Sequence, residues 1–388
     1  MIAAQIAMTL VLLVGAGLLI HSFVRLASVS PGFELGGRDG VVQAVKVTLP
    51  ERLYDGPERI HAFAPRVLER IRYLPGVTSA SLINSLPFGM MFIQGDFQFE
   101  GQPKPTLMAG QPKIDAGYFK TMGIPLLAGR DFNATDTAAA PKVAIISERI
   151  ARECFPGGPG EALGRRVRLE YGGEWLTVVG VVAGIRQMGL DRHVQPMIYA
   201  PFQQEGGFVL RFVSFVARTA TPASVVQGIH AEIRRAAPEL PIESTVTMDE
   251  AVAASVAPPR FRMLLLALFA MTATLIATCG IYGLMDYAVT QRRREIGVRM
   301  ALGAERRDVL RLVLRRALRI VVAGLVVGLA GAAAVTRVLQ SFLFGVTPTD
   351  PLAFTAVTLA LVAVCLTAAW IPARRATRID PVAALRAE

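Results

Sequence analysis

Four long apolar stretches divide the chain. They cover about residues 2–20, 263–285, 320–336 and 352–371. A helix needs about 20 apolar residues to cross the hydrocarbon core of a bilayer, and each stretch is close to that length. The interval between the first and second stretches, about 230 residues, mixes apolar and polar positions. The pattern predicts an α-helical membrane protein with four transmembrane helices and a large α/β domain, built of two small lobes, inserted between spans 1 and 2.

The first part of this domain shows a strand–helix–strand pattern. Val41–Leu49 and Val77–Ser85 alternate as strands do, and Pro57 opens a helix that Pro75 and Gly76 end. The apolar face of that helix has residues spaced three and four apart: Ile60, Phe63, Val67, Leu68, Ile71 and Leu74. A βαβ-like unit is expected here.

The same pattern recurs at the end of the domain. Phe208–Ala217 and Ile242–Thr247 are expected to be strands, and the helix between them begins at Thr221 and Pro222. Its inward residues are expected to be Val226, Ile229, Ile233 and Ala237. Both flanking units are therefore expected to form one α/β lobe near the membrane.

A β-rich stretch separates the two units. Its turn signals are the glycines and proline of 157–159 and the glycines of 172–173. The expected strands are Lys142–Ser147, Arg165–Tyr171 and Trp175–Ile185. This stretch is expected to form a second lobe, inserted in the first.

The expected boundaries follow from these patterns and from the charge distribution. In chain order they are 1–25 for transmembrane helix 1, 26–258 for the extracytoplasmic α/β domain, 259–289 for transmembrane helix 2, 290–319 for a cytoplasmic segment, 320–336 for transmembrane helix 3, 337–351 for a short outer loop, 352–371 for transmembrane helix 4 and 372–388 for a cytoplasmic tail.

Positive charge is concentrated beside the spans. Gln291–Arg319 holds ten arginines and three acidic residues, a net charge of +7, and the tail after Ile371 adds +2. The whole chain carries +11. Short basic loops stay in the cytoplasm, so both segments are expected inside the cell membrane and residues 26–258 outside it. Because the basic residues orient the spans, no nucleic-acid partner is expected.

The beginning of the chain lacks its own orientation signal. No lysine or arginine precedes Arg25, and the apolar run is long for a cleavable signal peptide. Either the later spans determine the topology, or the chain is the rear part of a longer polypeptide. We favour the second interpretation.

Residue chemistry gives no sign of catalysis or of a bound cofactor. The three cysteines and four histidines are scattered, without metal-ligand spacing. Gly158–Arg166 (GPGEALGRR) lacks the Gly-Lys-Ser/Thr ending of a phosphate loop and is interpreted as a turn. No enzyme activity, cofactor or metal site is therefore expected.

One apolar stretch carries small residues at helical spacing. Gly324 and Gly328 are four apart, and Gly331 follows them. Small residues at this spacing let helix backbones approach closely in lipid. They predict a helix-packing face, either within the subunit or across a dimer.

The basic segment and the tail resemble a known family. Arg294–Ala304 (REIGVRMALGA) is similar to the signature of the MacB/FtsX-type permeases of ABC transporters, which have four spans per unit. Pro372–Leu385 (PARRATRIDPVAAL) resembles the C-terminal signature of that family. Parts of the outer domain also match: Val143–Arg152, Leu163–Arg166 and Val178–Ala183. The opening, Leu10–Phe23, is similar to the middle span of tandem eight-span permeases, of which this chain would be the C-terminal half.

The resemblance implies an ATP-driven complex whose ATPase is a separate cytoplasmic protein that binds the ATP. In such relatives the segment docks on the ATPase and transmits its motion to the outer domain. The docking residues carried over are Glu295, Ile296, Gly297, Arg299, Gly303, Ala304, Arg306, Val309, Leu310, Val313 and Leu314. The alternative is that this segment binds no protein and forms a basic helix lying on anionic lipid headgroups.

Efflux is the expected function within this family. The alternatives are lipoprotein release and control of cell-wall hydrolases, and, from other classes, a membrane-anchored sensor or a channel-forming transporter. Only short basic loops face inward, and the spans are nearly free of polar groups, which disfavours the last two. The expected partners are the ATPase subunit, the lipid bilayer, a second permease unit (fused or as a dimer) and a periplasmic or outer-membrane protein.

Overall fold

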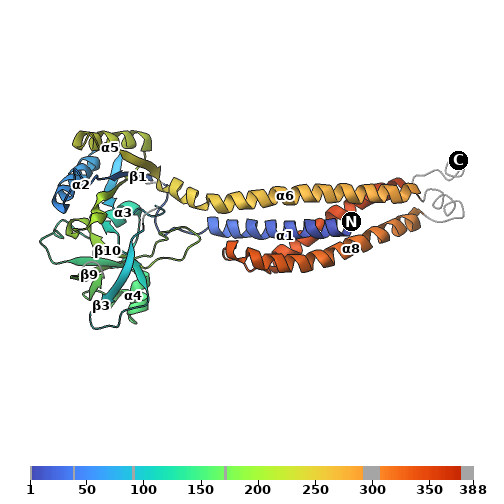
Figure 1. Cartoon of the computed structure of the whole chain (residues 1–388), viewed down its shortest axis with the longest axis horizontal. Coiled ribbons are helices and arrows are strands. Elements are labelled where there is room, and N and C mark those ends of the chain that lie inside the picture. The colour runs from blue at the N-terminus through green and yellow to red at the C-terminus, as the bar shows by residue number, and fades with distance from the viewer. Residues whose placement is uncertain (1, 38–39, 90–91, 170–172, 292–305, 377–388) are drawn as a thin grey trace. The chain divides into compact units, whose positions relative to one another are not determined.

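The chain folds into two compact units. The computed structural model describes residues 2–37, 40–89, 92–169, 173–291 and 306–376. One unit comprises residues 29–256, and the other joins residues 1–28 to residues 257–388. The first is the α/β domain and the second is a bundle of long helices (Figure 1). This confirms the predicted fold class: an α/β domain lies in the chain between the first and second apolar helices.

The first lobe of the α/β domain is built on four antiparallel strands. They are β1 (Val41–Thr48), β2 (Val77–Ile83), β11 (Phe212–Thr219) and β12 (Ile242–Thr247). Their order across the sheet is β12-β1-β11-β2. Two strand–helix–strand units are thus interleaved, in the split βαβ arrangement of ferredoxin-like folds.

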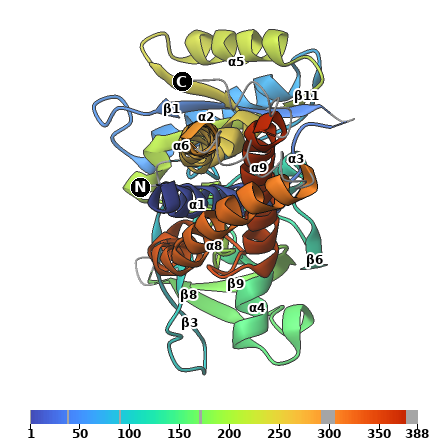
Figure 2. The same ribbon diagram turned by 90° about the vertical axis from the view of Figure 1, so that its right-hand side faces the viewer.

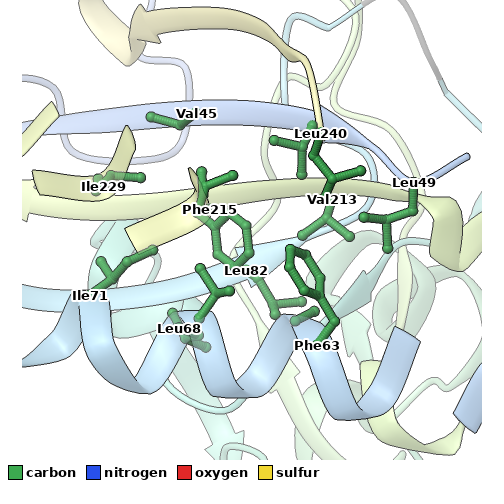
Figure 3. Close-up of a cluster of buried hydrophobic side chains, with 14 of the residues drawn as sticks. Val45, Leu49, Phe63, Leu68, Ile71, Leu82, Val213, Phe215, Ile229 and Leu240 are labelled. Atoms are coloured by element: carbon green, nitrogen blue, oxygen red, sulfur yellow. The ribbon is translucent and has the colours of Figure 1, made fainter. Parts of the chain in front are cut away.

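Two helices cover one face of this sheet (Figure 1). They are α2 (Pro57–Arg72) and α5 (Pro222–Ala236). Alternate residues of β1 and β11 point toward them because successive side chains of a strand face opposite sides. Figure 3 shows the resulting core, in which the labelled residues are Val45, Leu49, Phe63, Leu68, Ile71, Leu82, Val213, Phe215, Ile229 and Leu240.

Two sequence expectations for this lobe need correction. The stretch Phe208–Arg211 is a 3-10 turn, and the strand begins only at Phe212. In α5 the buried valine is Val225, whereas Val226 is half-buried. The sequence made no prediction of strand order: β11 lies between β1 and β2, and β1 lies between β12 and β11. Strand order depends on segments far apart in the sequence.

The second lobe continues the same sheet. Its strands and helices are β3 (Gln94–Phe99), β4 (Met108–Gly110), β5 (Lys113–Ile114), α3 (Tyr118–Met122), β6 (Leu126–Gly129), β7 (Val143–Ser147), α4 (Glu148–Cys154), β8 (Arg166–Leu169), β9 (Trp175–Val182) and β10 (Ile198–Pro201). From β2 the order runs β5-β10-β7-β9-β8-β3-β4, and β6 pairs with β9. The predicted turn at 158–160 is a short 3-10 helix. A separate core lies under α4, around Phe97, Phe99 and Phe155.

An ion pair lies where the two lobes join. Lys113 is on β5, a strand of two residues between β2 and β10, and its Nζ lies 2.7 Å from Glu205 Oε2. The lysine side chain is only 7% exposed. Burial raises the pKa of Glu205, but Lys113 and the N–H groups of Gly206 and Gly207 outweigh it, so the pKa is lowered.

A loop of the second lobe is fixed by a bidentate ion pair. Arg130 Nη1 and Nη2 donate to the two carboxylate oxygens of Asp136 at 2.8 and 2.9 Å. The backbone N–H of Asn133 donates to the same carboxylate at 2.9 Å. Asp136 is almost fully buried, and hydrogen bonds from Arg130 hold its pKa below the ordinary value.

Asp136→Asn should therefore destabilise the outer domain at neutral pH, by about 2 kcal/mol, because it weakens charge-assisted hydrogen bonds. A lowered folded-state pKa adds stability above the unfolded value of 3.8, which is lost as the pH falls through the folded value. The difference between variant and wild type should thus be full at pH 7 and shrink as the pH falls below 3.8. Urea unfolding followed by Trp175 fluorescence measures the difference in free energy of unfolding between variant and wild type at pH 7 and at pH 3. An equal difference at the two pH values would contradict the assigned ion pair.

Among the residues that the structure describes, the helical unit contains four helices long and apolar enough to span a membrane. The full helices are α1 (Ile2–Ala27), α6 (Met248–Gln291), α8 (Arg306–Leu339) and α9 (Pro351–Ala376). The beginning of α6, to Val256, belongs to the α/β domain. α8 runs without a break from the basic segment into the third apolar stretch.

Helix α1 is the best covered of the four. In the most apolar 18-residue stretch of α1, 44% is buried, whereas the buried share is 17–28% in the corresponding stretches of the other three helices. It packs against α8 and α9 (Figure 2). Ile6, Leu10, Val14 and Leu18, spaced four apart, form its buried stripe. The remaining core comes from α6, α8 and α9, including Met285, Val321 and Leu361.

Candidate functional site

The predicted glycine face of α8 lies directly against α1. A Cβ built on Gly324 would lie 2.8 Å from Cβ and Cγ2 of Ile6 and 2.9 Å from the carbonyl oxygen of Ala3. A Cβ on Gly328 would lie 3.0 Å from Ala7 Cα. Such distances are too short for an unstrained side chain. The structure therefore places these glycines at a backbone contact between two helices of the same chain.

Gly331 completes the same face with a looser contact. A Cβ there would lie 3.3 Å from Cγ2 of Val11, the tip of a side chain. Helix α1 also meets α6: the Thr9 hydroxyl, which donates to the carbonyl oxygen of Gln5 at 2.9 Å, lies 3.3 Å from the carbonyl oxygen of Ala273. Helix α1 therefore contacts both α8 and α6.

A cluster of polar contacts fixes the end of α1 to the α8–α9 connection. His21 Nδ1 lies 2.9 Å from Asp350 Oδ2, and the backbone N–H of Phe344 donates to Ser22 Oγ at 2.8 Å. Arg25 donates to the carbonyl oxygen of Gly345. The motif His21-Ser22 followed by Arg25, just after an apolar run, is a sequence signal that could have indicated this cluster.

Asp350 also caps helix α9. Its Oδ1 accepts the backbone N–H of Leu352 at 2.9 Å. Burial raises the pKa of Asp350, but the N–H groups of Leu352 and Ala353 and the contact with His21 outweigh it, so the pKa is lowered. A carboxylate at a helix N-terminus satisfies free N–H groups and interacts favourably with the helix dipole.

Most of the predicted docking residues lie outside the part of the chain that the structure describes. These are Glu295, Ile296, Gly297, Arg299, Gly303 and Ala304. The others begin α8, at positions spaced three and four apart that share one side of a helix: Arg306, Val309, Leu310, Val313 and Leu314.

The first turns of α8 also present a basic stripe. Arg311, Arg315 and Arg319 are exposed and lie four residues apart. Because α8 is one helix, this basic part is continuous with the glycine face farther along it. The contact predicted for a cytoplasmic partner and the contact with α1 thus lie on the same helix.

Sequence reasoning missed a cavity in the α/β domain. It has a volume of about 450 Å³ and lies against the sheet of the first lobe, bounded by the loop 84–89 and the beginning of α6. Its walls come from five separate segments, and only one of them carries a local sequence signal, the apolar stretch 87–93 (PFGMMFI).

The outer rim of this cavity has an unusual backbone. Phe88 is the only non-glycine residue with a positive φ (60°) among the residues that the structure describes. Its backbone N–H donates to the carbonyl oxygen of Gln187 at 2.8 Å, and its ring meets Phe33 edge-on at 5.9 Å. The apolar loop that begins at Pro87 is therefore held against its own lobe, as far as residue 89.

Four apolar helices with an α/β domain between the first and the second define a multi-pass membrane protein with an extracytoplasmic domain. Residues 5–236 match the MacB-like periplasmic core domain, and residues 267–381 match the FtsX-like permease C-terminal domain. The chain belongs to the MacB/FtsX-type permease family, in which it is an inner-membrane permease.

Its curated relatives are longer proteins. The macrolide export ATP-binding/permease protein MacB of Chromobacterium violaceum is 29% identical over 289 residues, which cover 71% of this chain and 43% of the relative. The Escherichia coli K12 MacB is 26% identical over 296 residues, with the same coverages. The pyoverdine export ATP-binding/permease protein PvdT of Pseudomonas putida is 28% identical over 270 residues, covering 68% and 41%. The chain therefore spans less than half the length of these relatives.

Two solved structures are weakly similar to this chain. The periplasmic region of MacB from Actinobacillus actinomycetemcomitans has 14% identity and a TM-score of 0.38, covering 58% of this chain and 93% of that one. The extracellular domain of the transporter YknZ from Gram-positive bacteria has 15% identity and a TM-score of 0.36, covering 53% and 99%. The family assignment rests on the two domain matches.

Proposed function

We propose that this chain is the permease unit of an ABC-type efflux complex. A separate cytoplasmic ATPase binds and hydrolyses ATP, and its closure moves the extracytoplasmic domain by mechanotransmission. The relatives MacB and PvdT carry both ATP-binding and export in their names. The basic segment supplies no phosphate loop of its own. A second permease unit, fused or as a dimer, and a periplasmic or outer-membrane partner complete the proposed assembly.

The observation that supports this proposal is the continuity of α8. Its first turns carry the predicted docking positions 306–314, and farther along the same helix Gly324 and Gly328 lie against α1. A helix hydrogen-bonded throughout transmits a displacement at one end to the other. Force applied by an ATPase at the beginning of α8 would therefore reach α1 without passing through a flexible joint.

Variants of the docking segment test the proposal. Glu295→Arg and Gly303→Trp should abolish co-purification of the ATPase from native membranes, because a lost charge-assisted contact at an interface costs about 2–5 kcal/mol, a fall in affinity of about thirtyfold or more. Insertion and folding of the outer domain should be unchanged.

Arg374→Ala with Arg375→Ala is the matched control, since it removes basic residues at the tail and should leave ATPase binding intact. If the Glu295 and Gly303 variants hold the ATPase with unchanged affinity while the segment loses binding to anionic vesicles, the segment is a lipid anchor and the proposal is wrong.

A further inference from the structure

All the described residues that line the cavity belong to the α/β domain, residues 29–256. Its floor is the face of the sheet opposite α2 and α5, and its other walls are the loop after β2 and the first turns of α6. Its volume of about 450 Å³ is in the range of pockets that hold drug-sized molecules. The lining residues are Ala44, Lys46, Asn84, Ser85, Leu86, Pro87, Phe88, Gly89, Ser214, Ser244, Val246, Ala251, Ala254 and Ser255.

The walls are mostly apolar and carry no net charge. Lys46 is the only charged residue among the described residues of the lining, and its Nζ lies 2.7 Å from Glu243 Oε2. The polar remainder consists of serine hydroxyls and the Asn84 amide. A charged molecule would lose its hydration without a free counter-charge, so the walls favour an uncharged ligand.

Asn84 anchors the start of the loop that forms one wall. The side chain is 3% exposed, and its Oδ1 accepts the backbone N–H of Lys113 at 2.7 Å. Its backbone N–H donates to the carbonyl oxygen of Lys113 at 3.1 Å, so the residue is fixed in place.

The wall formed by α6 is held in position before any ligand arrives. The Thr247 hydroxyl accepts the backbone N–H of Glu250 at 3.0 Å, and the Glu250 carboxylate accepts the N–H of Thr247 at 2.9 Å, which is a capping box. Asp249 accepts the N–H of Gly36 at 3.1 Å. Preformed walls reduce the entropy lost on binding.

We propose that this cavity binds an uncharged, largely apolar small molecule. The apolar part lies on Ala44 and Val246, against Ala254. The site lies in the extracytoplasmic domain, and binding there requires neither the ATPase nor ATP, so it stands apart from the proposed docking segment.

Photolabelling with benzophenone, an uncharged aromatic ketone, tests the site in the full chain reconstituted in phospholipid nanodiscs. After irradiation and digestion, mass spectrometry should find adducts in the peptides that contain residues 84–89 and 251–255. Adducts in the apolar helices, which form from probe dissolved in the bilayer, serve as the internal reference.

Two alanines of α6 give a matched pair of variants. Ala254 lines the cavity and Ala253 does not, and both are exposed. Ala254→Trp should reduce adducts in the two cavity peptides by about tenfold or more by filling the space, whereas Ala253→Trp should leave them unchanged. Adducts in the apolar helices should be equal in both variants.

Two outcomes would each overturn the proposal: adducts confined to the apolar helices, or an equal effect of the two tryptophan variants on the cavity peptides.

Discussion

Alanine at Gly324 is expected to destabilise the helical unit more than alanine at any other glycine of α8. The new methyl group would lie 2.8 Å from Cβ and Cγ2 of Ile6 and 2.9 Å from the Ala3 carbonyl oxygen, so α1 and α8 must separate. Overpacking of this kind costs about 1–3 kcal/mol, which lowers the unfolding midpoint by roughly 2–10 °C.

The other glycines should give a graded series. Gly328→Ala should be nearly as harmful, because the methyl would lie 3.0 Å from Ala7 Cα, whereas Gly331→Ala meets only the tip of Val11. Gly283 in α6 is the control: nothing lies within 4 Å of its Cβ position, so alanine should be neutral or stabilising by up to about 1 kcal/mol. Thermal unfolding of the detergent-solubilised chain, followed by tryptophan fluorescence, measures the series. Equal midpoints at Gly324 and Gly283 would show that this helix contact does not contribute to stability.

Glu205→Gln should destabilise the junction between the two lobes. It leaves Lys113, only 7% exposed, without its counter-charge, and breaking a buried ion pair from one side costs about 3 kcal/mol. Because the pKa of Glu205 is lowered, the wild-type contribution is present above the unfolded value of 4.5 and lost as the pH falls through the folded value. The effect of the variant should therefore be largest at pH 7 and decrease as the pH falls below 4.5.

Two further variants distinguish the loss of the charge interaction from the loss of side-chain packing. Adding Lys113→Met to Glu205→Gln should restore most of the stability, since replacing both charges of a buried pair is often neutral. Glu174→Gln is the exposed control: this carboxylate lies 4.0 Å from Lys142 and is 69% exposed, so its loss should cost under about 0.5 kcal/mol. Urea unfolding at pH 7 provides the values. If the double variant is as unstable as Glu205→Gln, the loss comes from packing rather than charge.

Local periodicity predicted the elements of the first lobe but not their pairing. The apolar spacing of α2 and the alternation in β1 and β12 depend on neighbouring residues, and these elements were found at nearly their true limits. That β11 lies between β1 and β2 depends on contacts between segments more than a hundred residues apart. Strands as short as β5, with two residues, have no period at all and exist only because β2 and β10 flank them.

The candidate sites also differ in whether a local sequence pattern could predict them. The glycine spacing of α8 is a local signal, so the packing face could be predicted, but its partner α1 could not, because it is almost 300 residues earlier in the chain. The docking residues 295–304 came from a resemblance and lie outside the described ranges. The apolar loop that begins at Pro87 is the one sequence signal for the cavity around Asn84, because β1, β11, β12 and α6 each supply only a few residues.

The central place of α1 has a consequence for how the protein is made. Its buried stripe, Ile6 to Leu18, needs α8 and α9 as neighbours, and α8 begins only at Arg306. At about 5–20 residues per second, a ribosome needs roughly 15–60 s to reach α8 after finishing α1. During that interval the large extracytoplasmic domain is synthesised and exported, while α1 waits in the bilayer with its packing face uncovered. The helix that ends most protected thus spends longest without its neighbours, and this is the period in which a membrane chaperone or a wrong helix partner would act on the chain.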